Sequence, residues 1–150
     1  VHDQGAALFD GIAGHAGLFG TANDLAKNLQ MLLNGGHYGG NRYFKRETVV
    51  EFTSKQYDNN RRGAGWDKPL MGEWYGPTSE YSSEQTFGHT GFTGTAIWVD
   101  PEYELIYVFL ANRIYPDASN SKLLSSNIRT RIQDVIYKAI HEYESVNLIN

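Results

Sequence analysis

The clearest structural signal in this chain is TAIWVDPEYELIYVFL, residues 95–110. Residues 95–99 predict one strand and residues 105–110 a second, because both segments are rich in β-branched and aromatic side chains. Residues 100–103 predict a turn between them, with proline where its fixed φ is favoured. The second strand is apolar throughout rather than alternating, so we expect it to be buried on both sides. Residues 87–110 as a whole are interpreted as a β-hairpin.

Two amphipathic helices are predicted to cover this sheet. Residues 22–33 carry leucine and alanine at helical spacing, and they follow a capping signal formed by Thr21 and Asp24. The tail predicts the longest helix, with one apolar stripe made of Leu124, Ile128, Ile132, Val135, Ile136, Ala139, Ile140 and Tyr143. We expect the tail helix to cover one face of the sheet. Helix 22–33, or polypeptide outside this sequence, would cover the other face.

The remaining segments predict less regular structure. Residues 37–45 indicate a loop, residues 46–53 a short helix, and residues 65–66 the start of a short strand. Residues 67–86 form a long polar and aromatic segment, and loops of this length within a compact domain are usually functional or disordered. The aromatic residues favour order. Together these elements predict an α+β fold in which helices flank an antiparallel sheet.

Length and composition exclude several classes of protein. The chain has 150 residues, 41% of them hydrophobic and 13% aromatic, which suits one folded domain or a large part of one. The net charge of −4 gives no basic surplus for nucleic acid, and no apolar run is long enough to span a membrane. Because cysteine is absent, a disulfide scaffold, a thiolate metal site and a cysteine nucleophile are excluded.

A near-repeat is the most unusual motif. GHAGLFGT at residues 14–21 matches GHTGFTGT at residues 88–95 in five positions. One interpretation is that glycine-rich turns resemble one another. The other is that His15 and His89 lie on glycine-flanked backbone facing one cleft. Neither segment has the glycine spacing of a dinucleotide-binding or phosphate-binding loop, so we expect no nucleotide cofactor.

Other catalytic motifs are missing or unconvincing. No H-E-x-x-H or G-x-S-x-G occurs, so neither a zinc protease helix nor an α/β-hydrolase elbow is encoded, and we expect no metal or other cofactor. His141 lies off the apolar stripe and is predicted to be solvated. A literal S-x-x-K occurs at residues 119–122, in a polar stretch where we expect a loop and the start of a helix rather than a nucleophile.

Several segments, in order, resemble one enzyme superfamily. FGHTGFTGT at residues 87–95, followed by a strand and Asp100-Pro101, resembles the third active-site motif of the serine β-lactamases and penicillin-binding proteins. The similarity is greatest to the class C-like branch of β-lactamases, D-Ala-D-Ala carboxypeptidases and esterases. AGHAGLF at residues 13–19, leading into helix 22–33, resembles another segment of this family, as does LANR at residues 110–113. The resemblance implies a partial β-lactamase-like fold.

The resemblance also implies roles for individual residues. The backbone N–H of Phe92 would stabilise an oxyanion, Gly91 would leave room for the substrate, and the Thr90 hydroxyl would bind a substrate carboxylate. His89 stands where many relatives have lysine, and it would donate a hydrogen bond to a catalytic tyrosine or to the leaving group. Since histidine changes charge near about pH 6.5, this favours peptidase or esterase activity over recognition of anionic β-lactams. Further substrate-binding candidates are His15, Trp74, Tyr75, Tyr81 and Asn112.

The family's S-x-x-K and Tyr-x-Asn motifs do not precede these segments. We therefore expect residues 1–150 to be the C-terminal part of a longer hydrolase, inactive in isolation and prone to self-association through uncovered apolar surface. The resemblance implies a small-molecule or peptidoglycan-type substrate and a periplasmic or other extracytoplasmic location. The alternative is a non-catalytic carbohydrate- or peptide-binding module of similar fold, such as one fused to a glycoside hydrolase.

Overall fold

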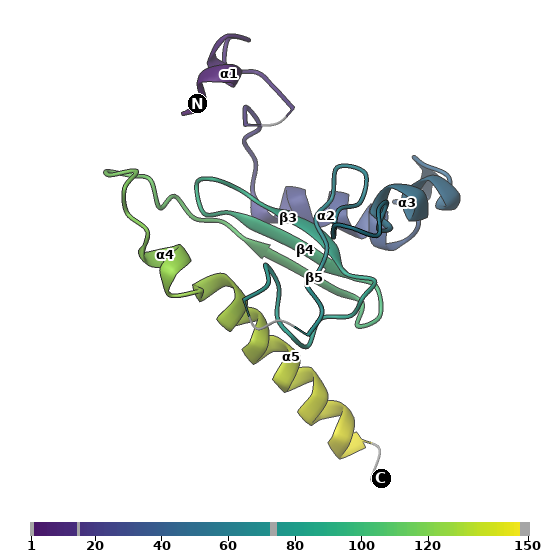
Figure 1. Ribbon diagram of the computed structural model, residues 1–150. Helices are drawn as coiled ribbons and strands as arrows, with labels where there is room; N and C mark the ends of the chain where they lie inside the picture. Colours follow the sequence, from purple (N-terminus) through teal and green to yellow (C-terminus); the bar gives the residue numbers. More distant parts are fainter. Residues whose placement is uncertain (1, 15, 73–74, 148–150) are drawn as a thin grey trace.

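The computed structural model describes residues 2–14, 16–72 and 75–147. Its centre is an antiparallel sheet in the order β3-β4-β5, formed by Phe87–Thr90, Ala96–Asp100 and Leu105–Phe109. Helix α2, Ala22–Leu33, packs on one face, and helix α5, Ile128–Asn147, runs along the other (Figure 1). The sequence-based α+β architecture is confirmed, and both expected helices cover the sheet.

Each face of the sheet has its own apolar cluster. On the α2 side, Phe87 and Val99 are register partners and pack against Leu29 of the helix. On the α5 side, Trp98 and Tyr107 are register partners, and α5 contributes Ile136 to their cluster. Because neighbouring residues of a strand point to opposite faces, both sets of side chains in β4 and β5 are packed. This explains why β5 is apolar without alternation.

The hairpin predicted over residues 87–110 is a three-stranded meander. Its first strand, β3, pairs with β4 from Phe87↔Val99 to Thr90↔Ala96, so the GHTG segment begins on a strand. Asp100 is the last residue of β4 and is 1% exposed, so the turn starts at Pro101, one residue later than expected. The reason is that the Asp100 carboxylate is held inside the protein by hydrogen bonds.

The short strand expected at residues 65–66 is absent, and this prediction was wrong. The chain instead makes an isolated bridge one residue later, between Asp67 and Gly88. The Asp67 N–H donates to the Gly88 carbonyl at 2.7 Å, and the Gly88 N–H donates back at 3.1 Å. One pair of hydrogen bonds satisfies both backbones, but it does not extend into a strand. The segment from residue 68 to 86 contains no strand or helix among its described residues, as predicted.

The predicted helix limits are confirmed for α2 and for α3, Arg46–Thr53. Thr21 and Asp24 form the capping box, in which each side chain accepts from the other residue's backbone N–H. The expected loop at residues 37–45 contains a small two-stranded hairpin, β1 at His37–Tyr38 and β2 at Asn41–Arg42. Four residues in a pair of strands give too little periodicity to be predicted from sequence.

The tail differs from the single helix that its apolar stripe predicted. A short helix α4, Lys122–Ser125, ends before α5 begins, and Asn127 between them has a positive φ of 48°. His141 is not solvated as expected: its Nε2 lies 3.1 Å from the Tyr103 hydroxyl, and its ring contacts the Tyr81 ring at 5.8 Å. Among the described helices, none has the length and apolar character needed to cross a membrane.

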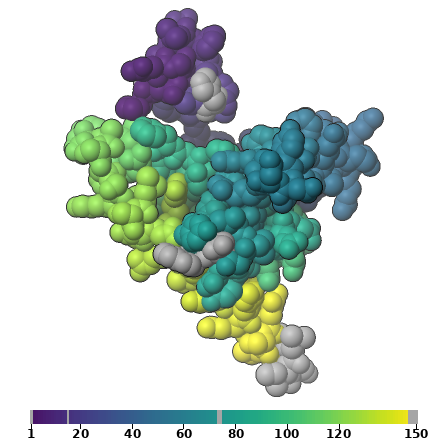
Figure 2. Space-filling view, in the orientation of Figure 1, coloured from purple at the N-terminus to yellow at the C-terminus, as the bar shows by residue number. Residues whose placement is uncertain are grey.

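The N-terminal segment projects from the body of the molecule (Figures 1 and 2), and its His2 ring stacks on the Phe92 ring with the ring centres 6.0 Å apart. It contains the one-turn helix α1, Gln4–Ala7. Large apolar side chains in this segment are exposed: Leu8, Phe9, Ile12, Leu18 and Phe19. Apolar surface of this kind is typical of contact surfaces, which is consistent with the expected self-association but does not test it.

Glycine at position 88 is required by the approach of β4. A Cβ on Gly88 would collide with the carbonyl oxygen of Ile97 and lie 2.6 Å from the Trp98 ring. Gly88→Ala should therefore lower the free energy of unfolding by about 2 kcal/mol, because a backbone oxygen cannot move aside without breaking the β3–β4 pairing. Urea unfolding measures this loss. Gly20→Ala is the matched control, since a Cβ there meets no atom within 4 Å; an equal loss in both variants would contradict the explanation.

Candidate functional site

The candidate site lies at the end of edge strand β3, where His89 is exposed. Its Nδ1 lies 2.7 Å from the Thr90 carbonyl oxygen, and its Nε2 lies 3.3 Å from Nη1 of Arg62. A carbonyl only accepts hydrogen bonds and a guanidinium only donates them. This geometry therefore selects the neutral imidazole with its proton on Nδ1, and Nε2 accepts from Arg62.

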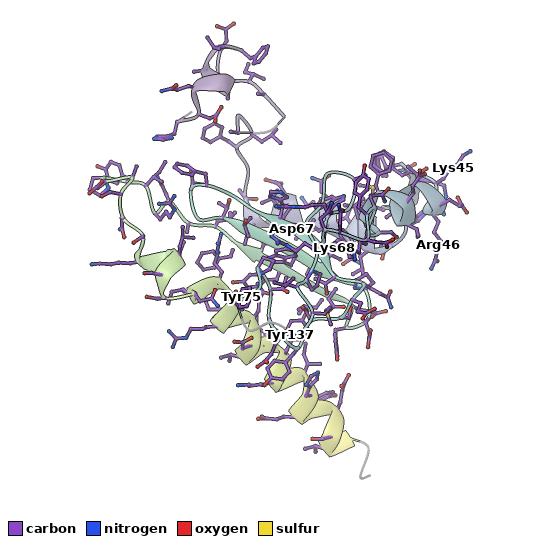
Figure 3. All side chains as sticks on the ribbon, viewed as in Figure 1. Lys45, Arg46, Asp67, Lys68, Tyr75 and Tyr137 are labelled. Carbon is purple, nitrogen blue, oxygen red and sulfur yellow. The ribbon has the colours of Figure 1, made fainter. Side chains whose placement is uncertain are left out.

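A buried carboxylate organises the residues around His89. Asp67 is 3% exposed and accepts two hydrogen bonds from one edge of the Arg61 guanidinium, from Nε at 2.7 Å and from Nη2 at 3.0 Å. Nη1 of Arg62 lies 3.2 Å from the same carboxylate. The backbone bridge from Asp67 to Gly88 places this cluster directly beside β3, and Figure 3 shows Asp67 and its neighbour Lys68 together at the sheet.

Sequence reasoning missed Arg62 and Asp67. The segment around residues 59–62 has the composition of a polar turn, and no motif or periodicity connects it with His89. The only feature of this segment that could have indicated a functional role is the pair of consecutive arginines, and consecutive basic residues usually form a solvated surface. Only pairing across the sheet edge brings positions 62 and 89 together.

The turn after β3 exposes a backbone donor. The N–H of Gly91 donates to the Thr95 carbonyl at 2.8 Å, and the N–H of Gly94 donates to the Gly91 carbonyl at 3.0 Å. Within the described part of the chain, the N–H of Phe92 has no acceptor. A Cβ at position 91 would collide with Oγ1 of Thr95, so any larger residue there would have to displace the Thr95 side chain. The tight turn thus leaves the Phe92 N–H without a partner in the described part of the chain.

Arg113 fixes this turn from the segment that follows β5. Its guanidinium lies 4.8 Å from the centre of the Phe92 ring, and its Nε donates to the Phe92 carbonyl at 2.9 Å. Its backbone N–H donates to the Thr93 carbonyl, also at 2.9 Å. Asn112 is exposed and directly precedes Arg113, so it lies near the turn in space although it is distant in sequence. Phe92 itself is 64% exposed.

The other expected site residues are not gathered at His89. The Tyr81 ring meets the His141 ring edge-on and lies under Lys138 of α5, near Tyr103 in the β4–β5 turn. That turn is at the opposite end of the sheet from Thr90, which pairs with the first residue of β4. Tyr75 is 60% exposed. His15 and Trp74 lie outside the described residues, so the proposed pairing of His15 with His89 has no structural test.

The S-x-x-K sequence at residues 119–122 forms a loop and a helix start, as expected. The Ser119 hydroxyl donates to the Asp117 carboxylate at 2.8 Å, and Lys122 is the first residue of α4. The serine therefore has no amine base. Among the described residues, no group of three histidine, aspartate or glutamate side chains is arranged to hold a metal ion.

A second buried polar cluster lies away from the site and anchors the loop before β3. The Asp100 carboxylate accepts from the Ser83 N–H at 2.9 Å, from the Ser83 hydroxyl at 2.6 Å and from the Tyr137 hydroxyl of α5 at 2.7 Å. Burial by itself raises the pKa of Asp100, but the combined hydrogen bonds from Ser83 and Tyr137 outweigh it and lower the pKa. Burial, with the bond to Asp100, raises the pKa of Tyr137. This cluster is therefore a structural anchor.

An open pocket of about 800 Å³ lies between α2, α3 and the segments that flank the long loop. Lys68 lines it and is almost completely buried, and its Nζ donates to the carbonyls of Thr53 and Gln85 at 3.1 and 3.2 Å. Burial lowers the pKa of Lys68. Arg61 also lines this pocket, but His89 does not. The pocket is thus adjacent to the site through the Arg61–Asp67 pair, and it reaches β3 at Phe87 but not at His89.

Comparison with known proteins places this chain in a family. The chain matches the β-lactamase family over residues 1–126, and it belongs to that family. It is 37% identical over 124 residues to proteins of Salmonella typhi and Salmonella paratyphi B that carry the provisional name D-alanyl-D-alanine carboxypeptidase. The crystal structure of a β-lactamase from Mycobacterium bovis has the same fold over 78% of this chain, with a TM-score of 0.57 and 24% identity.

These matches cover only part of the relatives. The alignment with each Salmonella protein covers 82% of this chain but only 29% of the relative. The structural match covers 44% of the Mycobacterium bovis chain. The described residues are thus similar to one portion of a larger β-lactamase-type domain. The resemblance found in the sequence motifs is confirmed at the level of family and fold.

Proposed function

We propose that this chain forms one wall of the active site of a serine hydrolase that cleaves peptides ending in D-alanine. The observation that carries the proposal is the unpaired N–H of Phe92, held by a tight turn at the exposed end of β3. A fixed backbone N–H at an accessible edge is suited to stabilise the oxyanion that develops when a serine attacks a carbonyl. The family and its named relatives support this class of reaction.

Each residue of the motif has a role in this proposal. Phe92 supplies the oxyanion donor, Gly91 keeps the edge free of side chain, and Thr90 offers its hydroxyl to the substrate. Nδ1–H of His89 donates its hydrogen bond to the Thr90 carbonyl oxygen, so the neutral imidazole has no second N–H to donate to a tyrosine or a leaving group. His89 would therefore act first as an acceptor and an orienting group. The attacking serine and its base would come from polypeptide outside residues 1–150.

The substrate class is inferred from the relatives. Their name describes removal of D-alanine from a D-alanyl-D-alanine end, which is found in cell-wall peptides, so the natural protein would work outside the cytoplasm. The exposed Phe92 ring and Asn112 would contact the substrate beside the motif. Tyr75 and Tyr81 would contact it only if the substrate extends along the α5 side of the sheet.

Covalent labelling tests the proposal. A fluorescent penicillin should acylate a serine of the natural protein that carries this chain, and mass spectrometry should place the adduct outside residues 1–150. The 150-residue chain alone should remain unlabelled, because its described serines lack a base comparable to the family's lysine. Labelling of the isolated chain that Ser119→Ala abolishes would contradict the proposal. A natural protein that takes no label and releases no D-alanine would instead support the non-catalytic binding module.

A further inference from the structure

We propose that the pocket between α2 and α3 binds a free monocarboxylate with an apolar chain, and that Lys68 holds its anionic head. This inference is independent of the hydrolase proposed above, because the pocket reaches β3 at Phe87 and does not include His89. Its volume of about 800 Å³ is within the range of small-molecule sites. Figure 3 shows Lys68 close to the sheet and Arg46, at the start of α3, farther from it.

Lys68 is a buried ammonium with one unused donor. The residue is 8% exposed, and its Nζ donates to the carbonyls of Thr53 and Gln85, which also line the pocket. An ammonium carries three N–H groups. Among the described residues, no third acceptor contacts Nζ and no carboxylate forms an ion pair with it. The remaining N–H can therefore donate to a ligand in the pocket.

The charge of Lys68 is not compensated by a neighbouring carboxylate. Burial lowers the pKa of Lys68 more than the Asp100 carboxylate raises it, and Asp100 is itself held by hydrogen bonds from Ser83 and Tyr137. A buried charge without a counter-charge is costly. An anion beside Nζ would remove that cost, and this favours an anionic ligand.

The other charges that line the pocket balance. Arg61 is compensated by its two hydrogen bonds to Asp67. The exposed charged residues in the described lining are two basic and two acidic side chains: Arg46, Lys55, Asp58 and Glu84. Lys68 thus leaves one positive charge at the pocket. A single negative charge matches it, whereas a phosphate dianion would remain half uncompensated.

Apolar side chains provide the surface for the rest of the ligand. Helix α2 contributes Leu32 and Leu33, α3 contributes Val49, and Leu70 and Phe87 flank the long loop. Val49 and Phe87 are buried, and the three leucines are half-buried. A hydrocarbon chain that covers these leucines would leave water, which favours binding in proportion to the area covered. The pocket thus combines one anion-binding group with an apolar wall.

A purely structural role for Lys68 is the competing explanation. Thr53 is the last residue of α3, so Lys68 also binds the C-terminal end of this helix, where positive charge is favourable. That role does not use the third N–H. It predicts that Lys68→Met is less stable, but it predicts no preference of the pocket for an acid over an alcohol.

Calorimetric titration of the 150-residue chain with octanoate tests the inference. 1-Octanol, which has the same chain without the charge, should bind about tenfold more weakly. Acetate, which has the charge without the chain, should bind at least about a hundredfold more weakly. Lys68→Met should weaken binding of octanoate about tenfold and leave that of 1-octanol within about threefold. Methyl NMR signals of Leu33 and Val49 should shift with octanoate.

The matched control is Lys122→Met, which removes the same charge from the exposed first residue of α4, outside the pocket. It should leave the affinity for octanoate unchanged. The inference fails if octanoate does not bind, if acid and alcohol bind equally, or if Lys68→Met binds octanoate as the parent does. Methyl shifts confined to the exposed Leu8 and Leu18 would also refute it.

Two further results keep the test decisive. If Lys68→Met does not fold, the comparison of octanoate with 1-octanol on the parent chain decides. The same titrations on the natural protein that carries this chain should give the same preference for the acid. Loss of octanoate binding there would mean that other polypeptide fills the pocket, and this would overturn the inference without affecting the hydrolase proposal.

Discussion

Under the proposed function, replacing Phe92 with proline in the natural protein that carries this chain should lower kcat by about 10²–10³-fold. Proline has no N–H, so the substitution removes the proposed oxyanion donor and leaves the nucleophile intact. The loss should appear in kcat more than in KM, because the oxyanion develops only in the transition state. Release of D-alanine from a D-Ala-D-Ala peptide, followed at saturating substrate, measures the effect.

The fold offers a reason why this variant should remain folded. The Phe92 N–H has no acceptor among the described residues, so removing this N–H costs no hydrogen bond. Proline restricts the backbone of the residue before it, and here that residue is Gly91, which tolerates the restriction. Phe92→Ala is the matched control. It keeps the N–H but loses the ring over which Arg113 lies, and it should retain kcat within about tenfold. Equal losses in both variants would show that the ring, not the donor, matters.

Asp100→Ala should lower the free energy of unfolding by about 3 kcal/mol or more. The substitution leaves the Ser83 N–H and the Tyr137 hydroxyl buried without their shared acceptor. Because these donors come from the long loop and from α5, losing the acceptor should loosen both from the sheet. Urea unfolding followed by tryptophan fluorescence measures the loss.

An exposed aspartate provides the control for this prediction. Asp117 accepts from the N–H and hydroxyl of Ser119 at 2.9 and 2.8 Å, the same pattern that Asp100 makes with Ser83, but in solvent. Asp117→Ala should cost less than about 0.5 kcal/mol, since water replaces the lost acceptor. A comparable cost for both variants would mean that burial of the carboxylate is not what matters.

The pH dependence of stability follows from the same carboxylate. Because the pKa of Asp100 is lower in the folded than in the unfolded chain, the ionised carboxylate contributes stability fully above the usual aspartate pKa of about 4. That contribution is lost as the pH falls through the lower, folded-state pKa. The difference in unfolding free energy between the parent chain and Asp100→Asn should thus shrink between pH 6 and pH 3. A constant difference across this range would contradict the assignment.

The elements of the core could be predicted because each carries its own local signal. Helix α2 was predicted at its observed limits from the apolar spacing and from the Thr21–Asp24 capping box, both of which act within a few residues. The unbroken apolar run of β5 correctly predicted a strand covered on both faces. The GHTG motif correctly predicted the family.

The candidate site was only half visible from the sequence. His89, Thr90, Gly91 and Phe92 stand in one motif, but their partners do not. Arg62 and Asp67 reach His89 through a single pair of backbone hydrogen bonds to Gly88, and Arg113 reaches Phe92 from beyond the next two strands. Tyr81 is an aromatic residue of the kind that often lines a cleft, but it packs at the end of the sheet away from His89. Residue type alone does not distinguish these cases.

Local sequence thus accounts for the helices, the apolar strands and the family motif, since periodicity, capping and turn preference depend on neighbours along the chain. The charge beside His89, its tautomer and the buried carboxylate of Asp100 were decided only when distant segments met in the folded protein. Each depends on an electrostatic contact or hydrogen bond across the sheet. Such an interaction acts through the few ångströms that separate two atoms, whatever number of residues lies between them in the chain.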